Sequence, residues 1–386
     1  MIPARRMALQ YVLLFGANGV SLPFAGLWFA AQGFSGVEIG TLLAAPMLAR
    51  VVTGPVLAVW ADGFTRRRTP IAILGAVAAL AYAGAGLTQG VWIQGALWWV
   101  GASAMAATIP LTDVLNLASA RRHGFAFAWP RGCGSAAFVA ANVLMGAVLA
   151  RASIDWVIVW IVVAGALIAL TASAFLPPEP VSDDGPGRKR DRYAGLARLA
   201  LDPGFMTAIL AIGAIQATHA FYYGFSAIAW KAQGISEAMT GLLWAVSVVV
   251  EIAFMWVIEP WRRARGIGPW PVLVLGGCAA VVRWTMLAVA PPLWALWPLQ
   301  ALHALTFAAT YLAGVEIIER LAPPGQHTGA QTLNSVMAAG ILIGLATLAA
   351  GPLYDRFGSL GYLAMTGLAM VGLLAAWRLK RVLAVS

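Results

Sequence analysis

Long apolar stretches, separated by short polar turns, organise the whole chain. A helix needs roughly 20 apolar residues to cross a bilayer, and twelve stretches of about that length can be distinguished. They run near 8–31, 37–60, 70–88, 92–117, 127–150, 154–176, 203–230, 238–258, 270–289, 293–318, 328–351 and 360–377. The turns are rich in Pro, Gly and basic residues, as in ADGFTRRRTP and PWRRARGIGPW. This pattern predicts an all-α integral membrane protein with twelve transmembrane helices.

The composition agrees with that prediction. Of 386 residues, 61% are hydrophobic and 10% are charged, whereas soluble domains carry about 25% charged residues. The N-terminal apolar run continues to about Ala31 without a small-residue cleavage site, so it is interpreted as the first span and not as a signal peptide. Cys133 and Cys278 both lie in apolar stretches and imply no disulfide framework.

The basic residues indicate the orientation in the membrane. Of 25 Lys and Arg residues, 19 lie in the turns on the side of the N-terminus, and only Arg151, Lys231 and Arg356 lie in turns on the other side. By the positive-inside rule, both termini are expected in the cytoplasm of a bacterial inner membrane. The net charge of +10 is therefore a topology signal and does not predict a nucleic-acid partner.

The chain consists of two similar halves. We expect one half at 1–176 and the other at 203–386, joined by a cytoplasmic linker at 177–202. AQGFSGVEIGTL (31–42) aligns with AQGISEAMTGLL (232–243) at an offset of 201. Six predicted spans separate the copies, so the repeat is parallel. The same offset pairs Asn18 with His219 and Arg50 with Glu251.

Several ionisable residues fall in the middle of predicted spans. Each charged side chain at a helix centre costs about 2.5–3.5 kcal/mol on insertion scales, and such residues are functional candidates by default. The alternative is a set of buried ion pairs that fixes the helix register. The set is Arg50, Asp113, Arg131, Glu251 and Arg283, with His219 and His303 beside them.

In the first half, Asp113 (IPLTDVLNL) and Arg131 (PRGCGSAAF) have opposite charges on consecutive antiparallel spans. They can pair with each other. Alternatively, the planar guanidinium of Arg131 can bind a substrate carboxylate with two hydrogen bonds. Gly132 and Gly134 would allow a close approach of another helix.

In the second half, Glu251, Arg283 and His303 come from three successive spans. Burial favours the neutral carboxylic acid, whereas a nearby Arg favours the carboxylate. Movement of Arg283 towards or away from Glu251 would therefore couple proton binding to a conformational cycle. His303 could relay the proton or hold a substrate oxygen. We predict that Glu251, Arg283, His303 and Asp113 couple protons to transport.

Aromatic residues accompany these polar groups, as is typical of pockets for small organic molecules. The predicted substrate-binding residues are Asn18, Arg50, Arg131, His219, Tyr222, Tyr223, Trp244 and Trp284.

These residues carry a resemblance to a known family. PLTD, the cluster of Arg131, Gly134 and Ser135, HAFYYGFSAIAW, VVRW and LHALTF resemble the 3-phenylpropionate permease family of the major facilitator superfamily, over nearly the whole chain. The resemblance implies two parallel six-helix repeats, alternating access, a monomer, and protons and a small organic acid as partners. That family tends to have Tyr-Gly-Lys where this chain has Phe127, Ala128 and Trp129, so the substrate can differ.

The spacing of Glu251, Arg283 and His303 also resembles the more distant lactose permease family, in which the corresponding residues serve substrate binding and proton coupling. Thr306 stands where that family has a proton-carrying Glu. This difference assigns the proton to Glu251 or Asp113.

Two loops resemble superfamily signatures and predict gating residues. The loop between the second and third spans keeps Asp62 and Arg66 of its motif, and GPLYDRFG supplies Asp355 and Arg356 on the opposite side.

The leading functional prediction is a proton-coupled symporter that imports a small organic acid, with an aromatic acid such as 3-phenylpropionate as the first candidate. A nucleoside or sugar proton symporter is an alternative. A drug–proton antiporter is another, although the fifth span lacks the Gly-Pro pair that is usual there. The sequence has no GxxxxGK[ST], HExxH or GxSxG, and its four His are scattered singly. No enzyme, metal or cofactor is therefore predicted.

Overall fold

The structure is a computed structural model that describes residues 3–180, 196–323 and 326–385. The chain folds into two compact units, Met1–Ser182 with Trp230–Ala245, and Asp183–Ala229 with Val246–Ser386. Most of the predicted linker at 177–202 lies outside the described residues. Within the described ranges the chain is almost entirely helical, and an isolated bridge joins Arg66 to Pro180.

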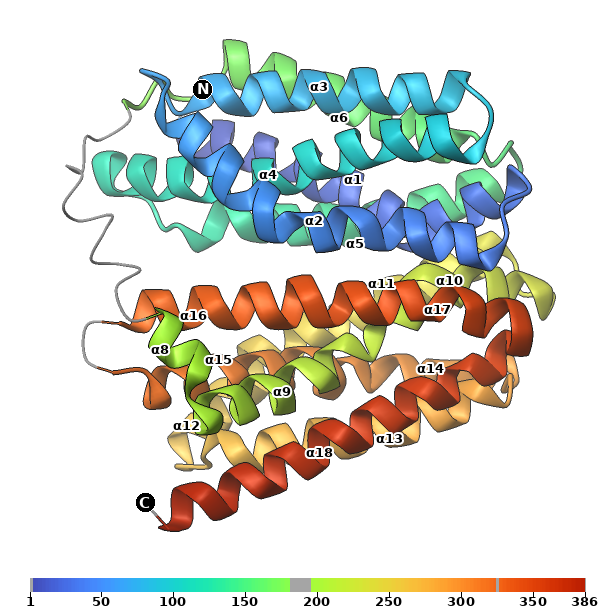
Figure 1. The fold of residues 1–386 in the computed structure, drawn as a ribbon. Coiled ribbons are helices and arrows are strands. Elements are labelled where there is room, and N and C mark those ends of the chain that lie inside the picture. Colours follow the sequence, from blue (N-terminus) through green and yellow to red (C-terminus); the bar gives the residue numbers. More distant parts are fainter. Residues whose placement is uncertain (1–2, 181–195, 324–325, 386) are drawn as a thin grey trace. The chain divides into compact units, whose positions relative to one another are not determined.

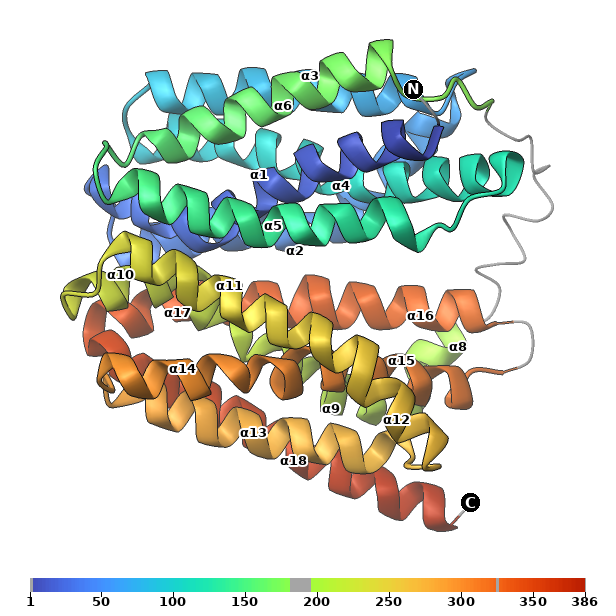
Figure 2. The same ribbon diagram turned by 180° about the vertical axis from the view of Figure 1, so that it is seen from behind.

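The first unit contains six long helices. In it, α1 packs against α5 and α6, while α3 packs against α4 and α6, and α2 lies on α4 (Figures 1 and 2). The helices are α1 (Pro3–Ala31), α2 (Gly36–Asp62), α3 (Arg68–Leu87), α4 (Val91–His123), α5 (Ala128–Leu149) and α6 (Trp156–Ala174).

The second unit has more interruptions along its helices. Here α18 packs against α9 and α13, and α13 also contacts α15. The elements of this unit are α8 (Leu196–Leu201), α9 (Pro203–Ala217), α12 (Glu259–Ala264), α13 (Pro269–Ala288), α14 (Leu293–Ala301), α15 (Thr310–Leu321), α16 (His327–Ser335), α17 (Ile343–Phe357) and α18 (Tyr362–Val385). The helices α10 (His219–Ala232) and α11 (Glu237–Ala253) lie partly in it, because Trp230–Ala245 belongs to the first unit. Between them lie the π-helical turns η1 (Phe254–Ile258), η2 (Ala304–Ala309) and η3 (Val336–Leu342), and the 3₁₀ turn η4 (Gly358–Gly361).

The predicted seventh span, 203–230, is broken at Thr218 between α9 and α10. The Thr218 hydroxyl donates to the carbonyl of Ile215 at 2.6 Å. Such a side-chain bond to the preceding turn competes with the helical ladder and often bends a helix.

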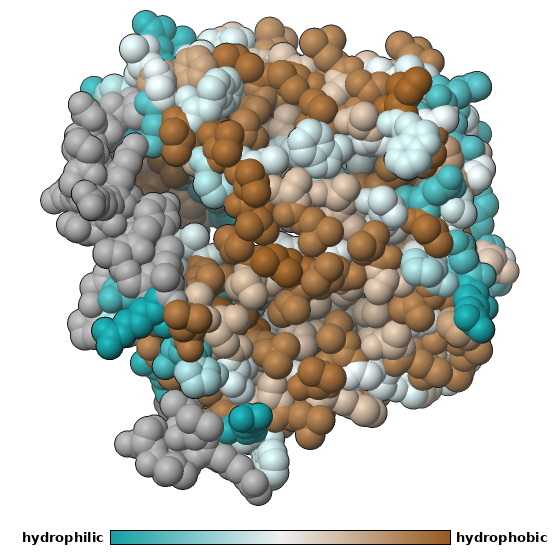
Figure 3. All heavy atoms as spheres, viewed as in Figure 1, coloured by the Kyte–Doolittle hydropathy of each residue, from teal (hydrophilic) through white to brown (hydrophobic). Residues whose placement is uncertain are grey.

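Eleven segments of the described chain are long and apolar enough to cross a membrane, and the last of them, Gly329–Lys380, has 52 residues. A single crossing takes roughly 20 residues. This segment turns at η4, where Gly358 has a φ of 54°, so it supplies two spans and brings the number to twelve. Hydrophobic side chains cover the middle of the helices on the face in Figure 3, and hydrophilic ones gather near the helix ends.

The repeat seen in the sequence recurs in the backbone. Gly33 has a φ of 86° and Gly234 a φ of 80°, a left-handed conformation that glycine adopts without strain. The amide of Phe34 donates to the carbonyl of Phe29 at 3.2 Å, and the amide of Ile235 donates to the carbonyl of Trp230 at 2.9 Å. The same turn thus ends α1 and α10.

Candidate functional site

A polar cluster in the first unit joins three helices. Arg131 on α5 forms an ion pair with Asp113 on α4. Tyr11 on α1 donates its hydroxyl to the same carboxylate oxygen, Oδ1, at 2.5 Å. The side chains of Arg131 and Asp113 are 41% and 30% exposed. In this structure Arg131 therefore pairs with Asp113 and does not present a free guanidinium to a substrate carboxylate. The pair is partly accessible.

Gly134 positions this cluster. A Cβ atom there would lie 2.9 Å from the ring of Phe15 and 3.1 Å from Cβ of Tyr11, whereas a Cβ atom at Gly132 would meet nothing within 4 Å. Gly134 therefore allows α5 to approach α1 closely enough for Tyr11 to reach Asp113. Tyr11 was not predicted as a site residue from the sequence, because a tyrosine in a first span is more often an interfacial anchor.

Two other predicted substrate residues of the first unit have surroundings of their own. Arg50 on α2 lines a pocket of ≈ 190 Å³ together with Asp62, Ser103 and Pro110. The side chain of Asn18 donates to the carbonyl of Leu14 in its own helix at 2.9 Å.

The polar cluster of the second unit is arranged around His303. Its Nε2 lies 3.4 Å from Oε2 of Glu251, and its Nδ1 lies 3.0 Å from Nη1 of Arg283. In this structure the imidazole of His303 thus lies between Arg283 and Glu251. Glu251 precedes η1 by three residues and His303 immediately precedes η2. Single π turns are frequent at functional sites.

The hydrogen bonds define the tautomers of both histidines. Arg283 can only donate, so Nδ1 of His303 accepts, and Nε2 carries the proton that faces Glu251. Nδ1 of His219 lies 3.0 Å from the carbonyl of Gln216 and must donate to it. In a neutral His219, Nε2 accepts from the hydroxyl of Thr306 at 3.1 Å, and that hydroxyl accepts from Arg283 at 3.0 Å. His303 is therefore a neutral imidazole in this arrangement.

Aromatic and amide groups complete the surroundings of Arg283. Its guanidinium carbon lies 4.8 Å from the ring centroid of Tyr222 and 4.7 Å from that of Trp284, close enough for cation–π attraction. Gln300 on α14 accepts from Arg283 at 2.9 Å and from the Tyr222 hydroxyl at 3.0 Å. Gln300 was not predicted from the sequence, because its neutral side chain does not interrupt an apolar span.

Of the other predicted aromatic residues, Tyr223 packs beside His219 with ring centroids 5.7 Å apart. Trp244 is buried, but it lies in the segment Trp230–Ala245, which belongs to the first unit.

The predicted gating residues lie at helix ends. Asp62 is the last residue of α2 and Arg66 forms the bridge to Pro180. Asp355 and Arg356 are exposed near the end of α17. Their gating role stays a prediction.

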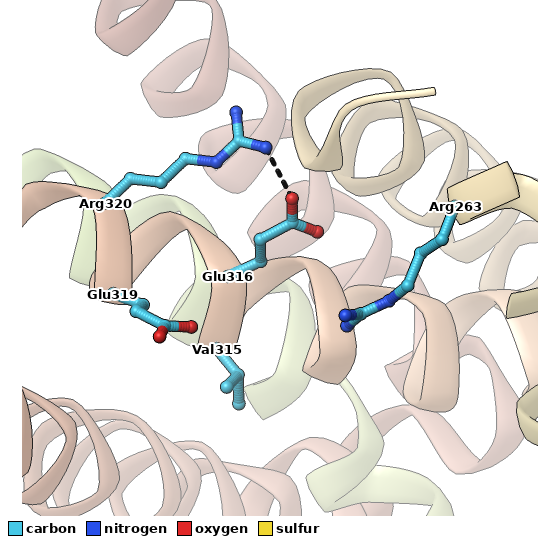
Figure 4. A pocket seen from close by; sticks show the side chains of 5 residues that line it. All are labelled: Arg263, Val315, Glu316, Glu319 and Arg320. Carbon is cyan, nitrogen blue, oxygen red and sulfur yellow. Dashed lines mark hydrogen bonds and ion pairs between the residues drawn. The ribbon is translucent and has the colours of Figure 1, made fainter. Parts of the chain in front are cut away.

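A second charged network, also missed from the sequence, links α12 to α15. Arg262 is buried and contacts Glu259 at 2.7 Å and Glu316 at 2.9 Å. Next to it is a pocket of ≈ 430 Å³ lined by Arg263, Val315, Glu316, Glu319 and Arg320 (Figure 4). Arg263 already pairs with Glu259 at 2.6 Å and Arg320 with Glu316 at 2.5 Å. These pairs favour a role in holding the two helices together over substrate binding.

Comparisons with known proteins agree with the fold. The chain is similar to a "Probable 3-phenylpropionic acid transporter" of Escherichia coli (strain K12), at 27% identity over 361 residues that cover 92% of each chain. The crystal structure of the nucleoside transporter NupG matches with a TM-score of 0.81 at 17% identity, over 98% of this chain and 99% of that chain. A bacterial homolog of the human lysosomal transporter Spinster, in an inward-facing and unoccupied conformation, matches with a TM-score of 0.75 at 14% identity, over 98% and 96%.

These structural matches confirm the predicted fold of two parallel six-helix repeats. A model described as "MFS_1 like family" matches residues 4–363. This family match and the description of the Escherichia coli relative as a probable transporter are consistent with the expectation that the chain is not an enzyme. This multi-pass membrane protein therefore belongs to the MFS_1 like family of the major facilitator superfamily and is a transporter.

Proposed function

We propose that this transporter is a proton-coupled symporter that imports a small organic acid by alternating access. An aromatic acid such as 3-phenylpropionate is the first candidate, because the relative with 27% identity is described as a probable 3-phenylpropionic acid transporter. The observation that carries the proposal is the chain of contacts from Glu251 through His303 to Arg283. Intramembrane acid and histidine groups of this kind are typical of proton relays.

Charge balance explains how this chain couples a proton to an anion. With Glu251 ionised and both histidines neutral, Glu251 and Arg283 balance each other across His303. When Glu251 binds a proton, the buried positive charge of Arg283 is no longer neutralised by a nearby negative charge. An uncompensated buried charge is energetically unfavourable. A monoanionic substrate restores neutrality. The proton thus favours binding of the acid, and one proton travels with one monoanion.

Asp113 is the second candidate for the proton. Because it already balances Arg131 within the first unit, we assign the principal role to Glu251 and keep Asp113 as an accessory group. The substrate-binding role of Asn18, Arg50, Arg131, His219, Tyr222, Tyr223, Trp244 and Trp284 is part of the proposal.

The distribution of basic residues supports insertion in the bacterial inner membrane with both termini in the cytoplasm. We further propose that the protein works as a monomer.

The test is uptake of labelled 3-phenylpropionate into liposomes that contain the purified protein, with and without an inward proton gradient. We expect gradient-driven accumulation that a protonophore abolishes. Downhill uptake that no proton gradient can drive uphill would contradict proton coupling. Accumulation of a nucleoside or sugar in place of the acid would contradict the substrate assignment alone.

A further inference from the structure

Arg283 is a buried cation whose direct partners are all neutral. The residue is 0% exposed. It donates to His303, Thr306 and Gln300 at 3.0, 3.0 and 2.9 Å. Within the described ranges, the carboxylate that it reaches is that of Glu251, and only through His303. Neutral acceptors offset the burial of a guanidinium only in part.

The same cluster contains several buried polar atoms that bond to no described group. They are Nε of Arg283, Nε1 of Trp284, Nε2 of Gln300 and the hydroxyl of Tyr362. Three of the four are N–H groups, which can only donate. Trp284 and Gln300 are 0% exposed and Tyr362 is 1% exposed. What the cluster lacks is a hydrogen-bond acceptor.

The geometry of Gln300 indicates where such an acceptor would bind. Its Oε1 is fixed by the bonds from Arg283 and Tyr222, so its Nε2 is fixed as well. Nε of Arg283 lies on the same edge of the guanidinium as Nη2, which makes the 2.9 Å bond to Gln300. Nε and Nη2 are both attached to Cζ of Arg283, and Nε2 and Oε1 are both attached to Cδ of Gln300, so the two unbonded N–H groups lie next to that hydrogen bond. Two such donors together with a cation suit a carboxylate.

We infer that the carboxylate of the substrate binds between Arg283 and Gln300 during the transport cycle, and that Gln300 determines the selectivity for acids. This inference rests on the proposed function, because it assumes that the substrate is an organic acid. The site is closed in this structure, so the substrate enters when the second unit opens around it.

The inference is tested by placing a carboxylate in the site permanently. Gln300→Glu keeps the size of the side chain and supplies an anion next to Arg283. The control is Gln216→Glu in the same unit, because Nε2 of Gln216 already donates to Phe307 at 3.0 Å and to Thr310 at 2.6 Å. Thermal unfolding of each purified variant is measured with and without 3-phenylpropionate.

We expect Gln300→Glu to raise the unfolding temperature of the ligand-free protein and to remove the further rise that 3-phenylpropionate causes in the unsubstituted protein. Gln216→Glu should lower the unfolding temperature and keep the ligand-induced rise. If Gln300→Glu is destabilised like the control and still responds to the acid, the inference is wrong.

A second variant covers the case in which Gln300→Glu does not fold. Gln300→Met removes both amide groups without adding charge, and the affinities for 3-phenylpropionate and its neutral analogue 3-phenylpropanamide are compared. The preference for the acid should fall by about tenfold or more, as expected for loss of a hydrogen bond to a charged group. An unchanged preference would overturn the inference. If the unsubstituted protein binds neither compound, the proposed substrate class fails instead.

Discussion

Each unit contains an arginine within a membrane-spanning helix, and the two units neutralise its charge in different ways. In the first unit Arg131 pairs directly with Asp113, and both side chains are partly exposed. In the second unit Arg283 is 0% exposed and is separated from Glu251 by His303. A direct pair neutralises itself and gains little from an added anion. A bridged pair can be unbalanced by a single proton.

This difference suggests that the two halves of the repeat have different roles. The turns around Gly33 and Gly234 have kept the same backbone conformation, whereas the polar groups have diverged. We expect the first unit to hold α1, α4 and α5 in place and the second unit to bind the proton and the acid.

The largest expected effect is a difference in proton-driven accumulation between variants of the two carboxylates, Glu251 and Asp113. Glu251→Gln should reduce proton-driven accumulation of substrate to background, because a glutamine cannot bind the coupling proton, while exchange of substrate across the membrane continues. Asp113→Asn should retain proton-driven accumulation. Uptake by both variants is measured in liposomes with an imposed pH gradient, and Glu319→Gln serves as a control outside both clusters. Normal accumulation by Glu251→Gln would remove the proposed asymmetry.

The next largest effect is a difference in binding of the acid between variants of the two arginines, Arg283 and Arg131. Arg283→Lys should weaken binding of the acid by about a hundredfold, because a lysine cannot make the separate bonds to His303, Thr306 and Gln300. Arg131→Lys should weaken it by only about threefold to tenfold, because a partly exposed ion pair contributes little. Equilibrium binding of labelled acid gives both values. Equal losses would show that the two cations share the substrate.

The sequence was a good guide to the fold because apolar length and charge distribution report directly on the bilayer. The spans and the proximity of Asp113 to Arg131 follow from those signals, and the parallel repeat follows from the alignment of 31–42 with 232–243. Its predictions were less complete inside the second unit. Gln300 is neutral and does not interrupt an apolar span, and η1 and η2 rotate the following side chains by an amount that hydropathy does not record.

The network of Arg262, Glu259 and Glu316 shows a related limit. In the sequence Glu259 and Arg262 follow the end of a predicted span, Glu316 lies near the end of another, and Arg262 is counted among the basic residues of a cytoplasmic turn. Its burial depends on α15 packing beside α12. Only tertiary structure brings those helices together.

A smaller effect, on the free energy of unfolding, tests the close contact between α1 and α5 in the first unit. Gly134→Ala should lower the free energy of unfolding by about 1–3 kcal/mol, because its Cβ atom overlaps Phe15 and crowds Tyr11. Gly132→Ala is the matched control, since nothing lies within 4 Å of a Cβ atom there, and it should be neutral or slightly stabilising. Chemical denaturation of the purified variants provides the comparison. Equal stability of the two variants would mean that the contact between α1 and α5 adapts to the extra methyl group.

The last prediction is that the membrane potential has no effect on uptake. It is the most demanding test of the pair that Glu251 and Arg283 form through His303. If one proton on Glu251 is matched by one monoanion at Arg283, no net charge crosses the membrane. Uptake at a fixed pH gradient should then be unchanged when a potential of about 100 mV is imposed with a potassium gradient and an ionophore. A second proton, for example on Asp113, would add about 2.3 kcal/mol per 100 mV to the driving force. Potential-driven accumulation would therefore show that the first unit also carries a proton and that the two units act alike.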